Sequence, residues 1–440
     1  MVTESISLTG VSDRSATERR ASIRRVALAS FIGTAIEWYD FFLYGTASAL
    51  IFPKLFFPQF SQVAGTLASF ATFGVGLVAR PMGGIVFGHF GDRVGRKSML
   101  VITLLLMGGA TFLLGLLPTF EQIGLLAPTF LVVLRFLQGF AVGGEWGGAM
   151  LMAVEHAPKE NRNFYASWPQ QGVPAGLVAS TAMFGIVSSL TGDHFLNWGW
   201  RVPFLFSVIL IGVGLFIRMR VLESPAFERI KERRAEVRFP LLELLRNTPI
   251  AAALAVGMCL ITVSGFYIGN TFILSYIAER FDLGRNVSLF GLLLAGAAES
   301  LGLLIFAPLA DRTGKRSIAI ASPVCVVLFA FPFFWMVNTG RASLIWLAMS
   351  LLQFIIAGLY AVTGVLLSEL FDTRLRYSGI SFGYQMAGLL AAPAPLICAA
   401  LVHWAGGASW PVATYLAAVA FLTFIAVSLA SRRERIAIIA

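Results

Sequence analysis

Cysteine, histidine and charge are all scarce in this sequence. Its 440 residues include three cysteines and four histidines, and charged residues make up only 13% of the total. Cys259, Cys325 and Cys398 lie far apart inside apolar stretches, which is typical of small core residues rather than of disulfides or metal ligands. The sequence also shows no phosphate-binding loop and no metal-spaced cluster of histidine and cysteine. We therefore expect no metal, no cofactor and no enzymatic activity.

Apolar residues dominate the rest of the chain. Hydrophobic residues make up 57% of it and the mean hydropathy is +0.80, which ordinary soluble domains do not reach. A helix needs about 20 residues to cross a bilayer. Polar breaks divide the chain into twelve apolar runs of about this length, near 26–52, 63–88, 98–118, 125–155, 164–190, 202–220, 250–278, 287–309, 317–337, 343–368, 378–401 and 411–431. The sequence therefore predicts an all-α membrane protein with twelve transmembrane helices.

The net charge of +10 is concentrated in every second connection between these runs. The basic clusters are Arg14 to Arg25, Arg93 to Lys97, Lys159 with Arg162, Arg218 to Arg246, Arg312 to Arg316, Arg374 with Arg376, and Arg432 to Arg435. By the positive-inside rule these connections and both termini are cytoplasmic, so the basic balance indicates topology and not nucleic-acid binding. The first run is expected to be a retained helix rather than a signal peptide, because it follows a polar tail and contains acids. The expected segments are a tail (1–25), a first bundle (26–220), a cytoplasmic linker (221–249), a second bundle (250–431) and a tail (432–440).

The second half of the chain repeats features of the first. Asp92-Arg93-Val94-Gly95-Arg96-Lys97 returns as Asp311-Arg312-Thr313-Gly314-Lys315-Arg316, again between two apolar runs. Glu155 precedes Arg162 by the same interval at which Glu369 precedes Arg376. Arg135-x3-Gly139 aligns with Phe354-x3-Gly358, so this arginine belongs to the first half alone. Two related six-helix bundles are typical of transporters.

These motifs resemble the major facilitator superfamily. Within it, Glu37 to Gly45, Gly88 to Arg93 and Gly139 to Gly148 resemble the metabolite:proton symporters, a group that includes shikimate, α-ketoglutarate, citrate and proline/betaine permeases. Trp198 to Phe206 most resembles the shikimate-transporter branch. The resemblance implies two pseudo-symmetric six-helix bundles that expose a central site to either side of the membrane in turn.

Three charged residues are candidates for proton coupling. Glu37 and Asp40 lie near the middle of the first helix and share one face of it. A carboxylate at that depth is costly unless it is neutral or paired, so either acid is expected to take up a proton, or else to form a structural hydrogen bond. Arg135 lies deep in the fourth helix, where the resemblance implies a coupling role. It is expected to pair with an acid of the first helix, to bind a substrate carboxylate, or to do both in turn. Arg80 is expected near the cytoplasmic end of the second helix, where its head group reaches the surface.

Polar and aromatic side chains in several helices are candidates for substrate binding, with helix packing as the alternative for each. They are Arg135, Glu145, Trp146, Gln170, Gln171, Tyr267, Asn270, Tyr384 and Gln385. Neutral hydrogen-bonding groups of this kind suit a hydroxylated or carboxylated metabolite. Glu299, near the middle of the eighth helix, lies outside the family pattern; its expected role is in the substrate or proton path, or in a buried hydrogen bond.

Charged residues at the cytoplasmic helix ends are candidates for gating, as the resemblance implies. They are Asp92, Arg93, Arg96, Glu155, Arg162, Asp311, Glu369 and Arg376. An aspartate can accept hydrogen bonds from the free N–H groups at a helix start, and we expect Asp92 to do so at Tyr377-Ser378-Gly379. Glu155 with Arg162 and Glu369 with Arg376 are expected to complete the charge clusters. Ala307 replaces a glycine of the family motif, so the second copy is expected to close less tightly.

The sequence therefore predicts a proton-coupled importer of a small organic acid, either shikimate-like, a di- or tricarboxylate, or an aromatic acid. It is expected in the bacterial inner membrane, as a monomer, with lipid, protons and an organic anion as its partners. The alternatives are a proline/betaine-type osmolyte symporter and an exporter of the same fold. A drug antiporter is disfavoured because Gly172 to Gly176 only half matches the expected fifth-helix motif.

Overall fold

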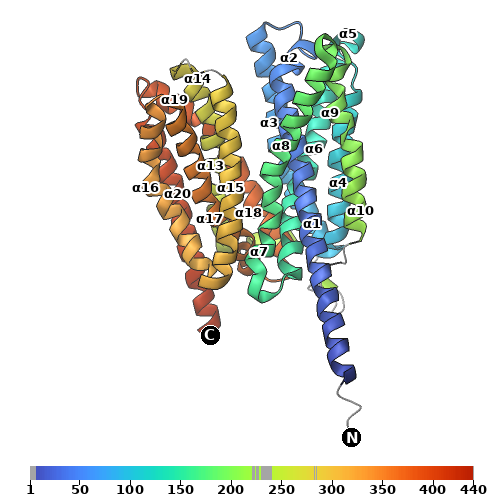
Figure 1. The fold of residues 1–440 in the computed structure, drawn as a ribbon, viewed down its shortest axis with the longest axis vertical. Helices are drawn as coiled ribbons and strands as arrows, with labels where there is room; N and C mark the ends of the chain where they lie inside the picture. Colours follow the sequence, from blue (N-terminus) through green and yellow to red (C-terminus); the bar gives the residue numbers. More distant parts are fainter. Residues whose placement is uncertain are drawn as a thin grey trace.

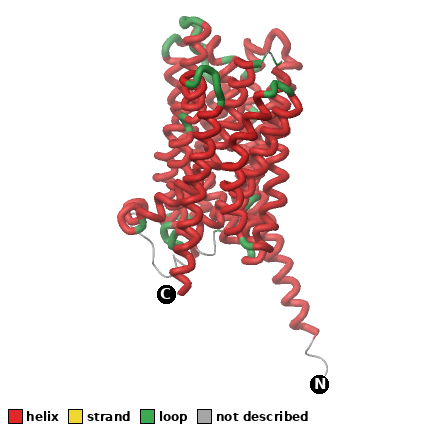
Figure 2. Tube along the Cα trace, turned by 90° about the vertical axis from the view of Figure 1, so that its left-hand side faces the viewer, coloured by secondary structure: helices red, strands yellow, loops and turns green. Residues whose placement is uncertain are grey.

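The computed structural model describes residues 6–220, 223, 227–228, 240–281, 283 and 285–439. All regular secondary structure in these residues is helical (Figure 2). Twelve helices are long and apolar enough to cross a membrane, which confirms the predicted number. These spans are Ile23–Leu50, Ala64–Arg93, Arg96–Leu116, Leu126–His156, Lys159–Gly199, Arg201–Met219, Pro249–Ala278, Leu289–Thr313, Lys315–Asn338, Ala342–Leu370, Arg376–Trp404 and Trp410–Ser431.

Six spans form each half of the molecule. In the first half they are built from α1 (Ile6–Leu50), α3 (Gln62–Arg93), α4 (Arg96–Leu116), α6 (Leu126–His156), α8 (Trp168–Thr191), and α9 (Arg201–Leu205) with α10 (Ser207–Met219). In the second half they are built from α13 (Pro249–Phe266) with η4 (Tyr267–Phe272) and α14 (Ile273–Arg280), α15 (Arg285–Thr313), α16 (Lys315–Asn338), α17 (Ala342–Leu370), α18 (Arg376–Ala391) with α19 (Ala394–Trp404), and α20 (Trp410–Ile439). The short helices include α2 (Phe52–Leu55), α5 (Phe120–Ile123), α7 (Arg162–Ala166) and α12 (Pro240–Asn247).

The two halves stand side by side and meet mainly at one end (Figure 1). We name this the terminal end, because the first and last described residues, Ile6 and Ile439, lie there. It holds the turn between α3 and α4, helix α7, the turn between α15 and α16, and the connection from α17 to α18. There α18 packs against α3 and α6, and α7 packs against α15 and α17. The opposite end is named the distal end, and in Figure 1 α2 and α3 lie apart from α14 and α19 there.

The repeated sequence motif forms the same turn twice. Gly95 between α3 and α4 has φ 126°, and Gly314 between α15 and α16 has φ 93°. Only glycine adopts such angles without strain. The aspartate, arginine and basic residues around each glycine are therefore presented at equivalent positions of the two halves.

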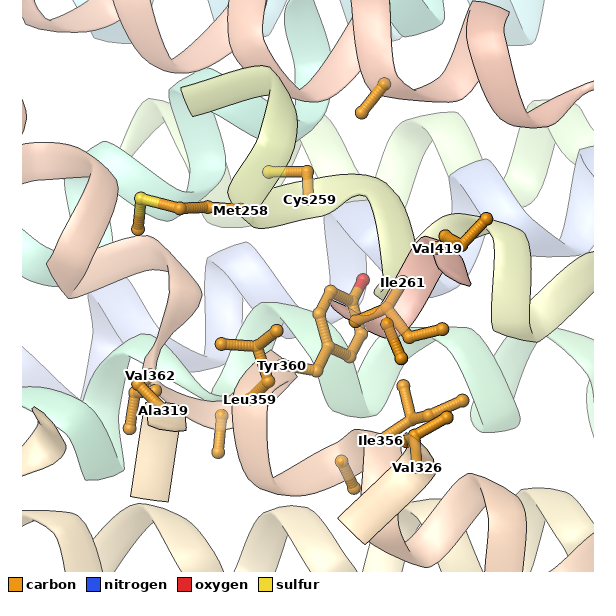
Figure 3. Close-up of a cluster of buried hydrophobic side chains, with 14 of the residues drawn as sticks. Met258, Cys259, Ile261, Ala319, Val326, Ile356, Leu359, Tyr360, Val362 and Val419 are labelled. Atoms are coloured by element: carbon orange, nitrogen blue, oxygen red, sulfur yellow. The ribbon is translucent and has the colours of Figure 1, made fainter. Parts of the chain in front are cut away.

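Small residues bring the helices of the first half into close contact. A Cβ atom built on Gly139 of α6 would lie 2.1 Å from the Gly76 carbonyl oxygen, and one on Gly83 of α3 would lie 1.7 Å from the Phe140 carbonyl oxygen. Neither position accepts a side chain unless the backbone moves, so α3 and α6 are packed along their glycine faces. In the second half, α13, α16, α17 and α20 enclose an apolar core that includes Met258, Ile356 and Tyr360 (Figure 3).

The predicted tails and linker differ from the structure in extent. Helix α1 begins at Ile6, so most of segment 1–25 is continuous with the first span, and α20 continues to Ile439. Within the predicted linker, 221–249, only 223, 227–228 and 240–249 are described, and the rest lies outside the described residues. Helix α12 packs against α13, α18 and α3 at the terminal end.

Candidate functional site

A pocket lies between the two halves near the middle of the spans. Helices α1, α3 and α8 of the first half and α13, η4, α15, α17 and α18 of the second half contribute to it, and about 600 Å³ of its space is free of protein atoms. Its lining residues are Trp38, Leu77, Arg80, Val173, Thr262, Val263, Phe266, Tyr267, Glu299, Tyr360, Tyr384, Gln385, Gly388 and Leu389. A mostly apolar and aromatic cavity with few polar groups is typical of a small-molecule site.

Arg80 is the basic residue of this pocket. It lies near the middle of the span Ala64–Arg93, and its guanidinium carbon is 5.0 Å from the centre of the Phe41 ring. The expectation that Arg80 lies near a helix end and reaches the surface is therefore wrong, because α3 extends to Arg93 and places Arg80 thirteen residues from that end. At 1.5 Å per residue this corresponds to a depth of roughly 20 Å. Counting from the charged turn would have given this depth from sequence alone.

The second half contributes most of the polar groups of the pocket. Tyr267, Glu299, Tyr360 and Tyr384 line it from four different segments. The Tyr384 ring stacks on Trp146 of the first half with a centroid distance of 3.7 Å. Gln385 donates from Nε2 to the Gly143 carbonyl oxygen at 3.0 Å, so its amide also joins the two halves. Of the predicted substrate residues, Tyr267, Tyr384 and Gln385 line the pocket, and Trp146 contacts it through Tyr384.

Arg135 lies outside the pocket and is connected to Asp40 by hydrogen bonds. Its Nη1 donates to Gln138 Oε1 at 2.6 Å, Gln138 Nε2 donates to Thr111 Oγ1 at 2.7 Å, and the Thr111 hydroxyl donates to Asp40 Oδ2 at 2.7 Å. All four side chains are buried. We call this series the Asp40–Arg135 chain. Thr111 and Gln138 are not among the residues predicted from the sequence, because neither carries a charge that stands out in an apolar run.

Aromatic rings separate Arg135 from Arg80. The Arg135 guanidinium carbon is 4.1 Å from the centre of the Tyr44 ring and 4.6 Å from that of Phe73. It is also 6.0 Å from the centre of the Phe41 ring, which contacts Arg80 at 5.0 Å. Phe41 therefore contacts both cations. Arg80 therefore lines the pocket, whereas Arg135 lies outside it and is connected to Asp40 only through Gln138 and Thr111.

Glu37 and Glu145 face the interior of the first half. Glu37 is 3% exposed, its Oε2 has no hydrogen-bond partner among the described residues, and the charges of Arg80 and Arg218 act on it. Glu145 forms an ion pair with Arg218 and accepts a hydrogen bond from Thr103 at 2.8 Å. The ion pair joins α6 to α10 and the Thr103 hydrogen bond adds α4, which is the packing alternative for Glu145. From the sequence, Arg218 was expected in the basic cluster of a cytoplasmic connection (Arg218 to Arg246), whereas it is a buried residue of α10.

The remaining predicted substrate residues bind the protein itself or lie beside the pocket. Gln170 Nε2 donates to the Tyr360 carbonyl oxygen at 3.4 Å, and Gln171 Nε2 donates to the Ser300 carbonyl oxygen at 3.0 Å. Both glutamines therefore join α8 to the second half. Asn270 lies in η4 close to Tyr267 but is not among the pocket-lining residues.

Two aspartates hold helix starts across the interface at the terminal end. Asp92 accepts hydrogen bonds from the Tyr377 backbone N–H at 3.2 Å and the Ser378 backbone N–H at 2.9 Å, the contact expected from the sequence. In the second half, Asp311 accepts from the Asn163 and Phe164 backbone N–H groups, each at 2.9 Å. Each carboxylate therefore meets the positive end of a helix in the other half. The two contacts are related by the internal repeat.

A buried ion cluster supplements these contacts, with partners that differ from those predicted. Glu155 pairs with Arg96 and also with Arg376 of the other half, at 3.2 Å, rather than with Arg162. Glu369 pairs with Lys315 at 2.7 Å rather than with Arg376. Helix ends that are far apart in the sequence meet at this end. The spacing of residues along the chain therefore does not show which acid pairs with which base. Arg93 is exposed and extends toward His89.

The terminal end of the described structure is closed. Asp92, Asp311, Glu155 and Gln385 each form a hydrogen bond between the two halves, at positions from this end up to the pocket. We expect Asp311→Asn to raise the ratio of terminal-open to closed molecules by about tenfold or more, because charged hydrogen bonds to helix N–H groups are worth about 1.5–3 kcal/mol each.

Spin labels on Lys159→Cys and Thr313→Cys, with the native cysteines replaced, measure this population as a long-distance component. Asp372→Asn is the matched control, since Asp372 is an exposed acid at the same end that bonds to Arg374 of its own half. An unchanged distance distribution in Asp311→Asn would show that this aspartate does not hold the closed state.

Comparison with known proteins agrees with this architecture. The family model of the Major Facilitator Superfamily matches residues 30–395. The Shikimate transporter of Escherichia coli K12 is 44% identical over 402 residues, which cover 90% of this chain and 91% of the relative. The Inner membrane metabolite transport protein YhjE of the same organism is 42% identical over 417 residues, covering 93% and 94%. The Proline/betaine transporter of that strain is 31% identical over 417 residues, covering 92% and 82%.

A solved structure shows the same fold. The proton:xylose symporter XylE, bound to 6-bromo-6-deoxy-D-glucose, aligns with a TM-score of 0.70 at 16% identity, over 94% of this chain and 95% of that one. Twelve spans in two related halves, the repeated charged turn and the match over most of the chain agree with one another. The chain belongs to the Major Facilitator Superfamily and is a membrane transporter of metabolites.

Proposed function

We propose that this protein imports a small organic acid together with protons, by alternating access about the central pocket. The observation that carries the proposal is the position of Arg80 in the pocket between the two halves. No acid lies within 4.0 Å of Arg80 among the described residues. A guanidinium in a largely apolar cavity can bind a carboxylate through two parallel hydrogen bonds. An anionic ligand also offsets the free-energy cost of holding the arginine's charge there.

The Asp40–Arg135 chain is the proposed coupling element. When Asp40 is charged, it accepts the Thr111 hydrogen bond, and the Thr111 and Gln138 orientations hold Arg135 against its aromatic rings. Protonation of Asp40 weakens that acceptor and frees the chain to rearrange. Phe41, which contacts both Arg135 and Arg80, then links the state of the chain to the geometry of the pocket. Such a link between proton binding and ligand binding is what symport requires.

We further propose that the terminal end faces the cytoplasm, so that the described state is open toward the outside. Positive charge at this end supports this orientation. The first bundle (26–220) and the second bundle (250–431) would then rock about the pocket. Opening of the terminal end requires release of the Asp92, Asp311 and Glu155 contacts, which is the gating role proposed for them and for the basic residues around them.

The proposal is tested by uptake in cells that express the protein, with labelled shikimate, α-ketoglutarate, citrate, an aromatic acid and betaine. We expect one acid to accumulate only while the proton gradient across the membrane is maintained. Accumulation of that acid at an unchanged level in the presence of a protonophore would contradict proton coupling.

A second candidate function is osmolyte uptake of the proline/betaine kind. It is favoured by Glu299 and by the rings of Trp38, Tyr267 and Tyr360, since a carboxylate and aromatic faces also suit a quaternary ammonium group. Arg80 would then bind the single carboxylate of the zwitterion. Gradient-dependent uptake of betaine, without uptake of any acid in the same panel, would select this function.

A further inference from the structure

Glu299 is a buried acid of the pocket that the proposed transport cycle does not use. It lies on α15, is 7% exposed, and lines the same cavity as Arg80. No hydrogen bond or ion pair to its carboxylate is formed within the part of the chain that the structure describes. A carboxyl group buried within a membrane protein is costly without a partner, and the open direction for a partner is the pocket.

The charges of the pocket are divided between its two walls. Arg80 comes from α3 in the first half and Glu299 comes from α15 in the second half, and they do not form an ion pair with each other. The other ionisable side chains of the lining are the tyrosines Tyr267, Tyr360 and Tyr384. A ligand carboxylate bound to Arg80 therefore directs the rest of the ligand toward a wall that carries an acid and hydroxyl groups.

We infer that Glu299 makes this pocket selective for monocarboxylates whose far end carries hydroxyl groups, and that it excludes ligands with a second carboxylate. Hydroxyl donors satisfy the Glu299 carboxylate, whereas a second carboxylate meets a like charge in a pocket that has few polar groups to offset the repulsion. The inference rests on the proposed function, and it narrows the substrate class to a hydroxylated monocarboxylic acid.

Rigid packing fixes the wall that carries Glu299. Tyr360 belongs to the apolar core of the second half as well as to the pocket, and Figure 3 shows it among Ile356, Leu359 and Ile261. Ser300, the residue after Glu299, is bonded to Gln171 of the first half. The backbone next to Glu299 and one of the rings that share its pocket are therefore held in place, which favours a defined position for this residue.

The test compares ligand binding by purified Glu299→Gln and unmodified protein, as ligand-induced shifts of the unfolding temperature without a proton gradient. The ligands are a matched set: a hydroxylated cyclohexene carboxylate such as shikimate, the same ring without hydroxyl groups, α-ketoglutarate and betaine. We expect unmodified protein to prefer the hydroxylated acid by at least about tenfold over the other three. Glu299→Gln should weaken that ligand by about tenfold or more and tighten α-ketoglutarate by a similar factor.

Two further variants keep the outcome decisive. Glu299→Asp retains the charge and should still bind α-ketoglutarate weakly. Glu121→Gln changes an exposed acid of α5 at the distal end to an amide, and it should leave the order of ligand affinities unchanged. An unaltered ligand ranking in Glu299→Gln would overturn the inference, as would tighter binding of betaine or α-ketoglutarate than of the hydroxylated acid by unmodified protein. The ligand comparison on unmodified protein serves alone if Glu299→Gln is not recovered folded.

Failure of the inference is distinguishable from failure of the proposed function. The binding ranking needs no gradient, whereas the proposed function fails when accumulation is insensitive to a protonophore. Proton-coupled uptake of α-ketoglutarate, for example, would preserve the function and overturn the role assigned to Glu299.

Discussion

Replacement of Arg80 by glutamine is expected to lower kcat/KM for uptake of the transported acid by about 100-fold or more, because loss of a charged partner in a desolvated site costs several kcal/mol. Arg80→Lys is expected to recover only part of this loss. Lysine retains the charge but not the two-pronged donor geometry that fits a carboxylate. Initial uptake rates over a range of acid concentrations measure the effect.

The control for this variant is Arg341→Gln, which removes an exposed arginine at the distal end and should leave uptake unchanged. Equal amounts of each variant in the membrane, and equal unfolding temperatures, show that the loss is not one of folding. Arg80→Gln with the uptake kinetics of the unmodified protein would refute the assignment of Arg80 as the carboxylate site.

Replacement of Asp40 by asparagine is expected to abolish accumulation against a gradient while exchange of internal for external acid persists. Asparagine still accepts the Thr111 hydrogen bond but neither binds nor releases a proton. The carrier can then change sides only with acid bound, so the fall in gradient-driven accumulation should be at least about tenfold. Counterflow in preloaded proteoliposomes measures exchange in the same preparation.

Asp193→Asn is the matched control for Asp40→Asn, since Asp193 is exposed at the distal end. Thr111→Ser, which keeps the hydroxyl group, should retain coupling, whereas Thr111→Val should weaken it. Full accumulation by Asp40→Asn would show that another group, Glu37 above all, takes up the proton.

The fold follows closely from the sequence because its signals are local. The twelve apolar runs predict the twelve spans to within a few residues for most boundaries, and the repeated turn glycines, Gly95 and Gly314, have the positive φ that such a turn requires. The contact between Asp92 and the start of α18 also follows, since it depends on one acid and one helix end.

The candidate site is harder to predict from the sequence. It depends on how each helix is rotated about its axis and on how deep each residue lies in the membrane, for helices of both halves. Arg80 and Arg135 both lie deep, yet only Arg80 lines the pocket, since Arg135 turns toward Tyr44, Phe73 and Gln138. Glu145 likewise pairs with Arg218, a residue far along the chain that the sequence does not connect with it. Distances between helices decide these roles, and a single sequence contains no such distances.

Proton movement on addition of the acid tests the central claim most directly. In lightly buffered proteoliposomes without an imposed gradient, the account predicts that the external solution turns alkaline when the transported acid is added, and that Asp40→Asn gives no such change. Uptake of labelled acid at a normal rate with no alkaline shift in the unmodified protein would contradict the account.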